Sequence, residues 1–588
     1  MIKEGIYQRK ENIMYIQKKV SILIFIWSAF LFFLGLQYKF SDEYNLLLFW
    51  IPIFLMIGIV AYQIFFLTNR SYILFEIFVI YLVLHLVFVI GYYGLRGSDS
   101  NIDFYIAKQI LSNNNFYLDT GSKGYPLLHI FSSIISVFTR IDLLVIAKFL
   151  PSFISSLIVF PIYLIGFKLY GDKRVALFSC LIFGTIPQFT SFEASFVKEV
   201  FGLFIMVLFF YLLGASIRAK YRNFYVIVFI LIPVAILSHH LSSFMLLCLV
   251  IIYLIISFVL LYFNKILNVI KIKIKIMKSF PKKLNRNILL VVFIFIISLL
   301  VYWNFVLKYG IFELLLNTVL DAFGQQTTTT GATYAEYMNL GATPITTRGQ
   351  IVYYGFFFYT FLFAILLLIK IFLKNIINKI EDTTFIVFFF LSNAIGFASL
   401  YMLNGSVFPD RLITFAYLFG LIPITSIMLI MKKNIGKQLV AVLLISFMIF
   451  NFYNIDPHNY TSDASYTGGA ATEKEYLLAQ QLSIPNNIND DNKFYGYIAV
   501  LCAIADIKNE EPKFVRNAIQ NINIVTFRNS SSTAIINEAI YDIDLMNYKN
   551  NKKTEAIASI VRLFNYKNDI NVNKIGDFGR IYVIKGGL

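Results

Sequence analysis

Long apolar stretches are the feature that most constrains this chain. Residues 51–67, 143–167 and 289–303 are apolar almost throughout, and similar stretches recur over most of the sequence. A helix crosses the hydrocarbon core of a bilayer with about 20 apolar residues, whereas a helix of a soluble protein keeps one polar face. Of the 588 residues, 58% are hydrophobic and 14% are charged, and the mean hydropathy is +0.72. The sequence therefore predicts an all-α polytopic membrane protein.

The apolar stretches predict about 13 transmembrane helices. They begin near residues 20, 46, 72, 143, 175, 199, 223, 241, 288, 351, 384, 412 and 438. Residues 1–71 would form an N-terminal pair of helices, and residues 72–454 the main transmembrane module. The N-terminus shows no signal-peptide cleavage site, so we expect residues 20–38 to remain as a span.

The distribution of basic residues predicts the orientation of these spans. The net charge of +17 is dispersed over short loops between apolar stretches, which is typical of cytoplasmic loops and argues against nucleic-acid binding. The basic residues of alternate loops are Arg70; Lys168, Lys173 and Arg174; Arg218, Lys220 and Arg222; those within 265–286; Lys374 and Lys379; and Lys432, Lys433 and Lys437. We therefore expect a plasma-membrane protein with a cytoplasmic N-terminus and an extracytoplasmic C-terminus.

Three segments are expected on the outer side. Residues 95–141 and 308–350 form outer loops, and residues 455–588 form a small extracytoplasmic α/β domain. Within the first loop, the apolar stretch 127–138 is too short to span and is predicted to be interfacial or re-entrant. The three cysteines imply no disulfide framework.

Two acidic residues follow the third apolar stretch. On a helix, Asp99 and Asp103 lie four residues apart and share one face. A carboxylate beside a low-dielectric surface has a raised proton affinity, which suits a general base. The alternative is that Asp99 caps the helix and Asp103 is solvated.

Further ionisable residues lie at predicted outer ends of spans rather than near their middles, which favours surface chemistry over transport. Glu199 lies at the start of a predicted span. Its carboxylate has either a role in the reaction or only a favourable interaction with the helix dipole. The guanidinium of Arg411 is suited to bidentate binding of a phosphate. The alternative is that this side chain extends toward lipid headgroups. His239 and His240 are adjacent, and adjacent helical residues point about 100° apart. An interfacial role is therefore favoured over a metal site, and no nucleotide-binding motif is present.

Several short motifs follow one another in a set order over about residues 90–260. A span precedes Gly97-Ser98-Asp99, and Tyr125-Pro126-Leu127-Leu128, Tyr170-Gly171-Asp172-Lys173-Arg174, Glu199 and Ser238-His239-His240-Leu241 come later. This order resembles the GT-C superfamily of membrane glycosyltransferases, including the aminoarabinose transferases, the protein O-mannosyltransferases and their archaeal relatives. The segment 573–582 is also similar to the tails of archaeal members, and high Ile, Lys and Asn usage suggests an AT-rich genome.

The resemblance implies a sugar donor carried on a polyprenyl phosphate, such as dolichyl phosphate, and a lipid-linked glycan or glycoprotein acceptor. Asp99 matches the catalytic acidic residue by its spacing to Ala107. Members often have a second acidic residue directly after it, where this chain has Ser100, and Asp103 is expected to compensate. The acidic residue of the next outer loop matches Glu199.

The remaining site residues also follow from the resemblance. Arg411 matches a basic residue near the lipid phosphate, Lys123 and Arg348 are expected to assist it, and His239 and His240 are placed in the substrate-binding set. Asp99 would accept the acceptor's proton while its oxygen displaces the phosphate with inversion. Such basic contacts make a metal unnecessary, although a divalent metal stays open.

Four other functions were weighed. An oligosaccharyltransferase should carry a Trp-Trp-Asp-Tyr-Gly motif in its tail, but Trp27, Trp50 and Trp303 all lie in apolar stretches. A flippase or transporter of lipid-linked glycans should show internal repeats and polar residues near the midplane. A polysaccharide polymerase or ligase stays an alternative, although residues 308–350 contain a single arginine. A non-catalytic surface protein needs only one span.

Overall fold

The structure is a computed structural model, and nearly all the residues it describes are helical. It describes residues 2–38, 46–67, 72–90, 95, 98–113, 124–217, 223–269, 286–307, 347–372, 380–402, 409–431, 433–454, 533–537, 572–577 and 581–586. The elements before the middle of the chain are α1 Ile2–Tyr38, α2 Leu46–Phe66, α3 Ile73–Ile90, α4 Ser98–Asn113, α5 Leu127–Thr139, α6 Leu143–Leu157, α7 Val159–Tyr170, α8 Lys173–Phe183, α9 Pro187–Phe192, α10 Lys198–Ser216, α11 Phe224–Ser238 and α12 His240–Val269. They are followed by α13 Arg286–Val301, the π-helical turn η4 Tyr302–Val306, α16 Thr347–Phe372, α17 Ile380–Met402, α18 Pro409–Ile430 and α19 Lys433–Asn454.

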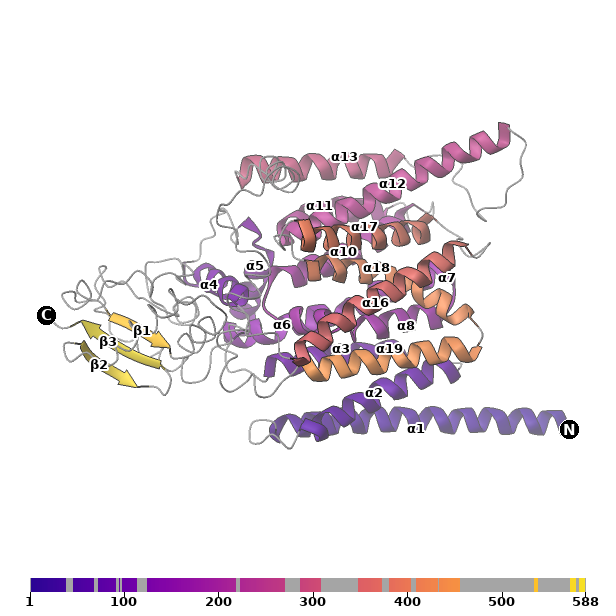
Figure 1. Cartoon of the computed structure of the whole chain (residues 1–588), viewed down its shortest axis with the longest axis horizontal. Helices are drawn as coiled ribbons and strands as arrows, with labels where there is room; N and C mark the ends of the chain where they lie inside the picture. The colour runs from indigo at the N-terminus through magenta and orange to yellow at the C-terminus, as the bar shows by residue number, and fades with distance from the viewer. Residues whose placement is uncertain are drawn as a thin grey trace.

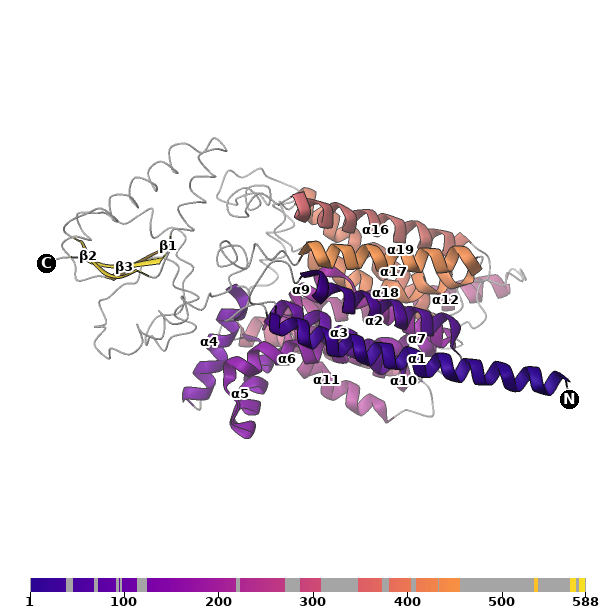
Figure 2. The same cartoon turned by 90° about the horizontal axis from the view of Figure 1, so that it is seen from below.

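The long helices lie side by side in one bundle, and α4 and α5 gather at one end of it (Figure 1). The strands lie beyond this end, whereas α1 begins at the opposite end (Figures 1 and 2). We refer to the two ends as the α4–α5 end and the opposite end. The helix α10 begins at the α4–α5 end, so its 19 residues carry the chain about 28 Å toward the opposite end.

The prediction of a polytopic helical membrane protein agrees with the helices described. Seven of them are long and apolar enough to cross a membrane, judged by length and composition. These spans are 16–34, 143–170, 198–216, 240–262, 286–306, 411–430 and 434–451, and five shorter helices are also apolar. Each of the 13 predicted span starts falls within a helix or one residue before it. That all of them cross the bilayer, and in which orientation, stays a prediction.

The turns between helices follow from local chemistry. Between α7 and α8, Gly171 takes the left-handed conformation with φ +70°, and its backbone N–H donates to the carbonyl of Phe167. The next residue, Asp172, caps α8 by accepting from the backbone N–H of Arg174. Between α6 and α7 the helix breaks at Ile158, three residues before Pro161, which lacks the N–H needed to continue the ladder.

The helices α4 and α5, within the predicted first outer loop, pack onto the bundle through a small apolar cluster. Phe104 and Ala107 of α4 lie against Leu128 of α5, together with Leu143 and Ala147 of α6. A hydrogen bond from the Ser133 hydroxyl to the carbonyl of Ala107 joins the two helices, at 2.9 Å. The predicted short apolar segment is therefore the 13-residue helix α5, and its position in the membrane interface stays a prediction.

The C-terminal region contributes three described strands, which are β1 Thr533–Asn537, β2 Val572–Asp577 and β3 Ile581–Gly586. They form one antiparallel sheet in the order β1-β3-β2, with a shift of register between Lys574 and Gly576. The helices expected in an α/β domain over 455–588 lie outside the described residues. Of the predicted outer loop 308–350, only the start of α16 is described.

Candidate active site

Ionisable side chains of α4, α5, α10 and α18, and of the residue after α9, gather at the α4–α5 end. We call this set the polar cluster, and its members are Asp103, His129, Glu193, Lys198, Glu199 and Arg411. Five of the six residues lie on helices that also bury apolar side chains. Their charges are therefore held close together in a medium of low dielectric, where they interact strongly.

Asp103 of α4 is the most tightly held member of the polar cluster. Its side chain is 1% exposed. Its Oδ1 lies 3.0 Å from Nε2 of His129 and 3.1 Å from Nζ of Lys198. Its Oδ2 accepts from the backbone N–H of Lys198 at 3.3 Å. Asp103 therefore ties α4 to α5 and to the beginning of α10.

These partners determine the acidity of Asp103. Burial alone would raise the pKa of the carboxyl, but the ammonium of Lys198 and the hydrogen bond from His129 outweigh it. The net pKa of Asp103 lies below its ordinary range. An ionised carboxylate with such a low proton affinity is a poor general base, so its geometry suits a positioning residue.

Glu199 and Arg411 form a second pair beside the first. Oε2 of Glu199 lies 3.3 Å from Nη1 of Arg411, and the two side chains are 3% and 17% exposed. The guanidinium also lies over the ring of Phe192, with its Cζ 4.5 Å from the ring centroid. The arginine is thus held in place by a carboxylate and an aromatic face while part of it stays accessible.

Glu193 lies next to this pair and is also buried. Its backbone carbonyl accepts from the hydroxyl of Ser155 at 2.8 Å. Within the described part of the chain, its Oε2 has no hydrogen-bond partner. Burial, together with the charge of Glu199, raises the pKa of Glu193 well above its ordinary value, although Arg411 opposes the shift. The carboxyl of Glu193 therefore keeps its proton to a higher pH than a solvated glutamate does.

The two histidines predicted in the substrate-binding set lie beside the polar cluster. His239 has an extended backbone between α11 and α12, and its Nδ1 lies 2.9 Å from the hydroxyl of Ser242. The ring centroids of His239 and His240 lie 4.5 Å apart. The expectation that both residues are helical and that their side chains point about 100° apart is therefore wrong. Burial, the neighbouring histidine and the nearby cations lower the pKa of His239 well below its usual value.

A glycine allows this close approach. A Cβ added to Gly202 of α10 would lie 2.5 Å from the hydroxyl of Ser242 and 2.8 Å from Cβ of His239. No real side chain tolerates such contacts without movement of α12. Gly202 therefore keeps the start of α10, with Lys198 and Glu199, next to the α11–α12 junction.

The other predicted site residues are placed only in part. The helix α4 includes Asp99 as its second residue, which confirms the predicted helical spacing of four between Asp99 and Asp103. The side chain of Asp99, the whole of Lys123 and the side chain of Arg348 lie outside what the structure describes. Arg348 is the second residue of α16.

Sequence reasoning missed three members of the polar cluster: His129, Glu193 and Lys198. The signal for His129 was an imidazole within the apolar stretch 127–138, and the signal for the other two was their position beside Glu199. Among the described residues, no group of three or more His, Cys, Asp or Glu side chains is arranged to hold a metal ion.

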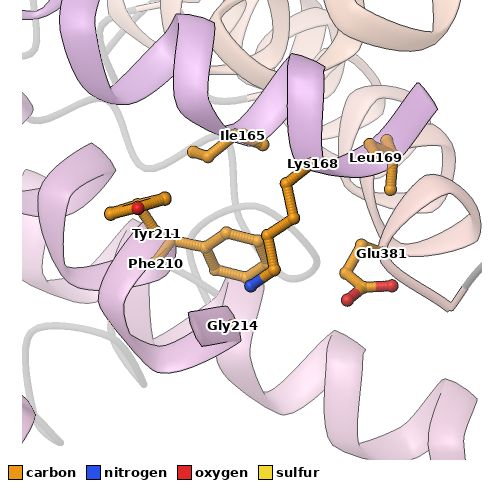
Figure 3. Close-up of a pocket in the computed structure, with 7 residues that line it drawn as sticks. All are labelled: Ile165, Lys168, Leu169, Phe210, Tyr211, Gly214 and Glu381. Atoms are coloured by element: carbon orange, nitrogen blue, oxygen red, sulfur yellow. The ribbon is translucent and has the colours of Figure 1, made fainter. Parts of the chain in front are cut away.

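The opposite end contains a small cavity between α7, α10 and α17. Figure 3 shows Lys168 of α7 extending toward Gly214 of α10, with Phe210 and Tyr211 on one side of it and Glu381 of α17 on the other. The cavity has a volume of about 30 Å³, which is room for a water molecule or two but not for a sugar.

A fully buried ion pair also lies at the opposite end. The ammonium of Lys370 lies 2.9 Å from Oδ1 of Asp382, and both side chains are 1% exposed or less. The same ammonium donates to the hydroxyls of Tyr170 and Ser426. We call these four residues the Lys370 network.

No protein-family model matches the sequence, and no curated protein matches it. Among solved structures, the chain is similar to the crystal structure of ArnT from Cupriavidus metallidurans bound to undecaprenyl phosphate. The TM-score is 0.40 and the identity is 11%, over 88% of this chain and 98% of that one. At that TM-score and identity the likeness carries no argument about fold or activity, so the function has to be inferred from this chain's own residues.

Proposed function

We propose that this chain is a GT-C-type membrane glycosyltransferase. It transfers a sugar from a polyprenyl phosphate, such as dolichyl phosphate, to a lipid-linked glycan or glycoprotein on the outer side of the plasma membrane. The observation that carries the proposal is the polar cluster, in which Lys198 and Arg411 lie beside three carboxyl groups at one end of an apolar bundle. The order of sequence motifs supports the same activity.

The position of the polar cluster suits a donor that is half lipid. A polyprenyl chain partitions into the apolar region, which leaves its phosphate and sugar at the membrane surface. The accessible cations of the polar cluster lie at the end of spans α10 and α18, where the phosphate would arrive. An arginine whose planar guanidinium is already oriented by Phe192 and Glu199 loses little freedom when it binds phosphate.

The proposed reaction is a single displacement. The acceptor hydroxyl gives its proton to Asp99, and its oxygen forms a bond to the anomeric carbon. The bond from that carbon to the phosphate oxygen breaks on the opposite face, which inverts the configuration and releases polyprenyl phosphate. We assign the base to Asp99 because Asp103, one turn later on α4, is already bound by His129 and Lys198.

The other residues stabilise the leaving phosphate or position the groups that do. Arg411 and Lys198 offset the negative charge that develops on the phosphate as the bond breaks. Glu199 holds Arg411, and Asp103 holds Lys198. Lys123 and Arg348 are proposed as further phosphate contacts, and His239 and His240 as neutral hydrogen-bonding groups toward the sugar.

The test is transfer of radiolabelled sugar from a polyprenyl phosphate donor by the purified full chain in lipid. The native protein should form product, and Asp99→Asn should lower the rate by about 10²–10⁴-fold, the usual contribution of a general base. Full activity of an Asp99→Asn protein that inserts normally would overturn the assignment of the base.

A second readout separates the rival functions. Absence of transfer from several donors, together with movement of labelled lipid between leaflets, would instead support a flippase. Formation of long glycan chains would support a polysaccharide polymerase or ligase. The same reconstituted protein serves for both measurements, so the outcomes are directly comparable.

A further inference from the structure

A groove with two basic residues lies apart from the polar cluster, between α4 and the corner that joins α5 to α6. Its volume is about 320 Å³, which is within the range of small-molecule binding sites. The residues that line it are Phe104, Lys108, Leu111, Ser136, Arg140, Ile141, Asp142, Leu143 and Leu144. Apolar side chains line it together with two cations, Lys108 and Arg140.

Arg140 takes an unusual backbone conformation at this corner. Its φ is +58°, and it is the one non-glycine residue with positive φ among the described residues. It occupies the position after α5 where helices usually have glycine, because a Cβ is disfavoured in the left-handed region. Backbone strain that persists at one residue points to a use for its side chain.

The corner is held rigidly around Arg140. Its backbone N–H donates to the carbonyl of Ser136 at 2.8 Å, and the hydroxyl of Ser136 donates to the carbonyl of Ile141 at 2.8 Å. Asp142 then caps α6 by accepting from the backbone N–H of Leu144 at 2.7 Å. The side chain of Arg140 is exposed, and no ion pair joins it to any other part of the chain that the structure describes.

An exposed apolar stripe runs along α5 to this groove. Phe131, Ile134 and Phe138 follow helical spacing on α5, Ile141 lies just beyond its end, and Phe138 is 84% exposed. The stripe continues on the exposed face of α6, through Val145, Phe149 and Phe153. Because α6 and α7 form one apolar stretch long enough to span, we expect the exposed face of α6 to contact lipid.

We propose that this groove binds the phosphate headgroup of an anionic phospholipid. Arg140 would contact the phosphate oxygens through its guanidinium, with Lys108 on the facing helix adding positive charge. The acyl chains would lie along the apolar stripe of α5 and α6. The proposal is independent of sugar transfer, because none of the groove residues belongs to the polar cluster.

The groove can be tested with a substitution that favours the fold. Arg140→Gly removes the cation and relieves the left-handed strain, so this variant should be at least as thermostable as the native protein in neutral detergent. Phosphatidylglycerol added to phosphatidylcholine nanodiscs should raise the Tm of the native protein. The affinity for phosphatidylglycerol should fall about tenfold or more in Arg140→Gly, as expected for loss of a charge-assisted contact.

Two controls make the result specific. Arg140→Lys keeps the charge and should keep most of the rise in Tm that phosphatidylglycerol causes. Arg174→Gln removes an exposed cation at the opposite end and should leave the affinity for phosphatidylglycerol unchanged. Equal phosphatidylglycerol affinity in the native and Arg140→Gly proteins would overturn the proposal. Arg140-dependent binding of undecaprenyl phosphate, but not of phosphatidylglycerol, would overturn it in favour of a donor-binding site.

Discussion

The two ends of the bundle treat buried charge differently. In the Lys370 network, one ammonium meets one carboxylate, and the hydroxyls of Tyr170 and Ser426 complete its contacts. In the polar cluster, three carboxyl groups face two cations, Lys198 and Arg411, which are 13% and 17% exposed. Within the described residues, Oε2 of Glu193 and Oδ2 of Asp382 both lack a hydrogen-bond partner, so the two ends differ in the exposure of their cations rather than in unsatisfied oxygens.

The difference separates a structural ion pair from a site prepared for chemistry. A buried ion pair with no solvent access holds helices in register, because both charges depend on each other. A cluster with accessible cations and a buried carboxyl of raised pKa can still exchange a partner or a proton. Burial of charge alone would therefore not have distinguished the proposed site from the Lys370 network.

The largest effect is expected at the opposite end. Asp382→Asn leaves the buried ammonium of Lys370 without a counter-ion, so the free energy of unfolding should fall by about 3–5 kcal/mol. The control is Asp172→Asn, which breaks an exposed pair with Arg174 at the same end and should cost at most about 1 kcal/mol. Thermal or denaturant unfolding of both variants in the same detergent measures the difference, and equal losses would mean that the Lys370 network does not hold the helices.

An intermediate effect is expected for Asp103→Asn. The amide keeps the shape but loses the charge that holds Lys198, so stability should fall by about 2 kcal/mol. Because Asp103 is proposed to position Lys198, which contacts the donor phosphate before and during bond cleavage, KM for the polyprenyl phosphate donor should rise and kcat should fall, by less than in Asp99→Asn. Transfer kinetics over a range of donor concentrations give both constants. A loss confined to kcat, as for Asp99→Asn, would make Asp103 a catalytic residue instead.

The smallest effect concerns Glu193 and depends on pH. Its pKa is raised in the folded state, so the folded protein keeps a proton that the unfolded chain loses above about pH 4.3. Native stability should therefore decline as pH rises from there toward the folded pKa. The Glu193→Gln variant cannot ionise at this position, so its Tm minus that of the native protein should increase as pH rises. A difference in Tm that does not change with pH would show that Glu193 is ionised in the folded protein.

Much of the architecture could be predicted from the sequence. Apolar length alone located the helices, because spanning a bilayer requires it, and Gly171 with Asp172 marked the turn between α7 and α8. The break at Ile158 was missed, since Pro161 lies within one continuous apolar stretch. Asp103, Glu199, Arg411 and the two histidines were each predicted singly.

Their mutual arrangement could not be predicted. His129 and Lys198 lie 26 and 95 positions from Asp103, and Tyr170 lies 212 positions from Asp382. Such pairings arise from the packing of helices, which local pattern does not encode. The raised pKa of Glu193 likewise depends on its burial beside Glu199.

The central claim is that sugar transfer takes place at the α4–α5 end. The most direct measurement is the transfer rate per folded molecule for Glu199→Gln and Asp382→Asn, two matched carboxyl-to-amide changes at opposite ends of the bundle. Glu199→Gln should lower the rate by about 10²-fold or more, because Arg411 loses the partner that orients it, and Asp382→Asn should keep the native rate. Native transfer by Glu199→Gln alongside loss of transfer by Asp382→Asn would contradict the account.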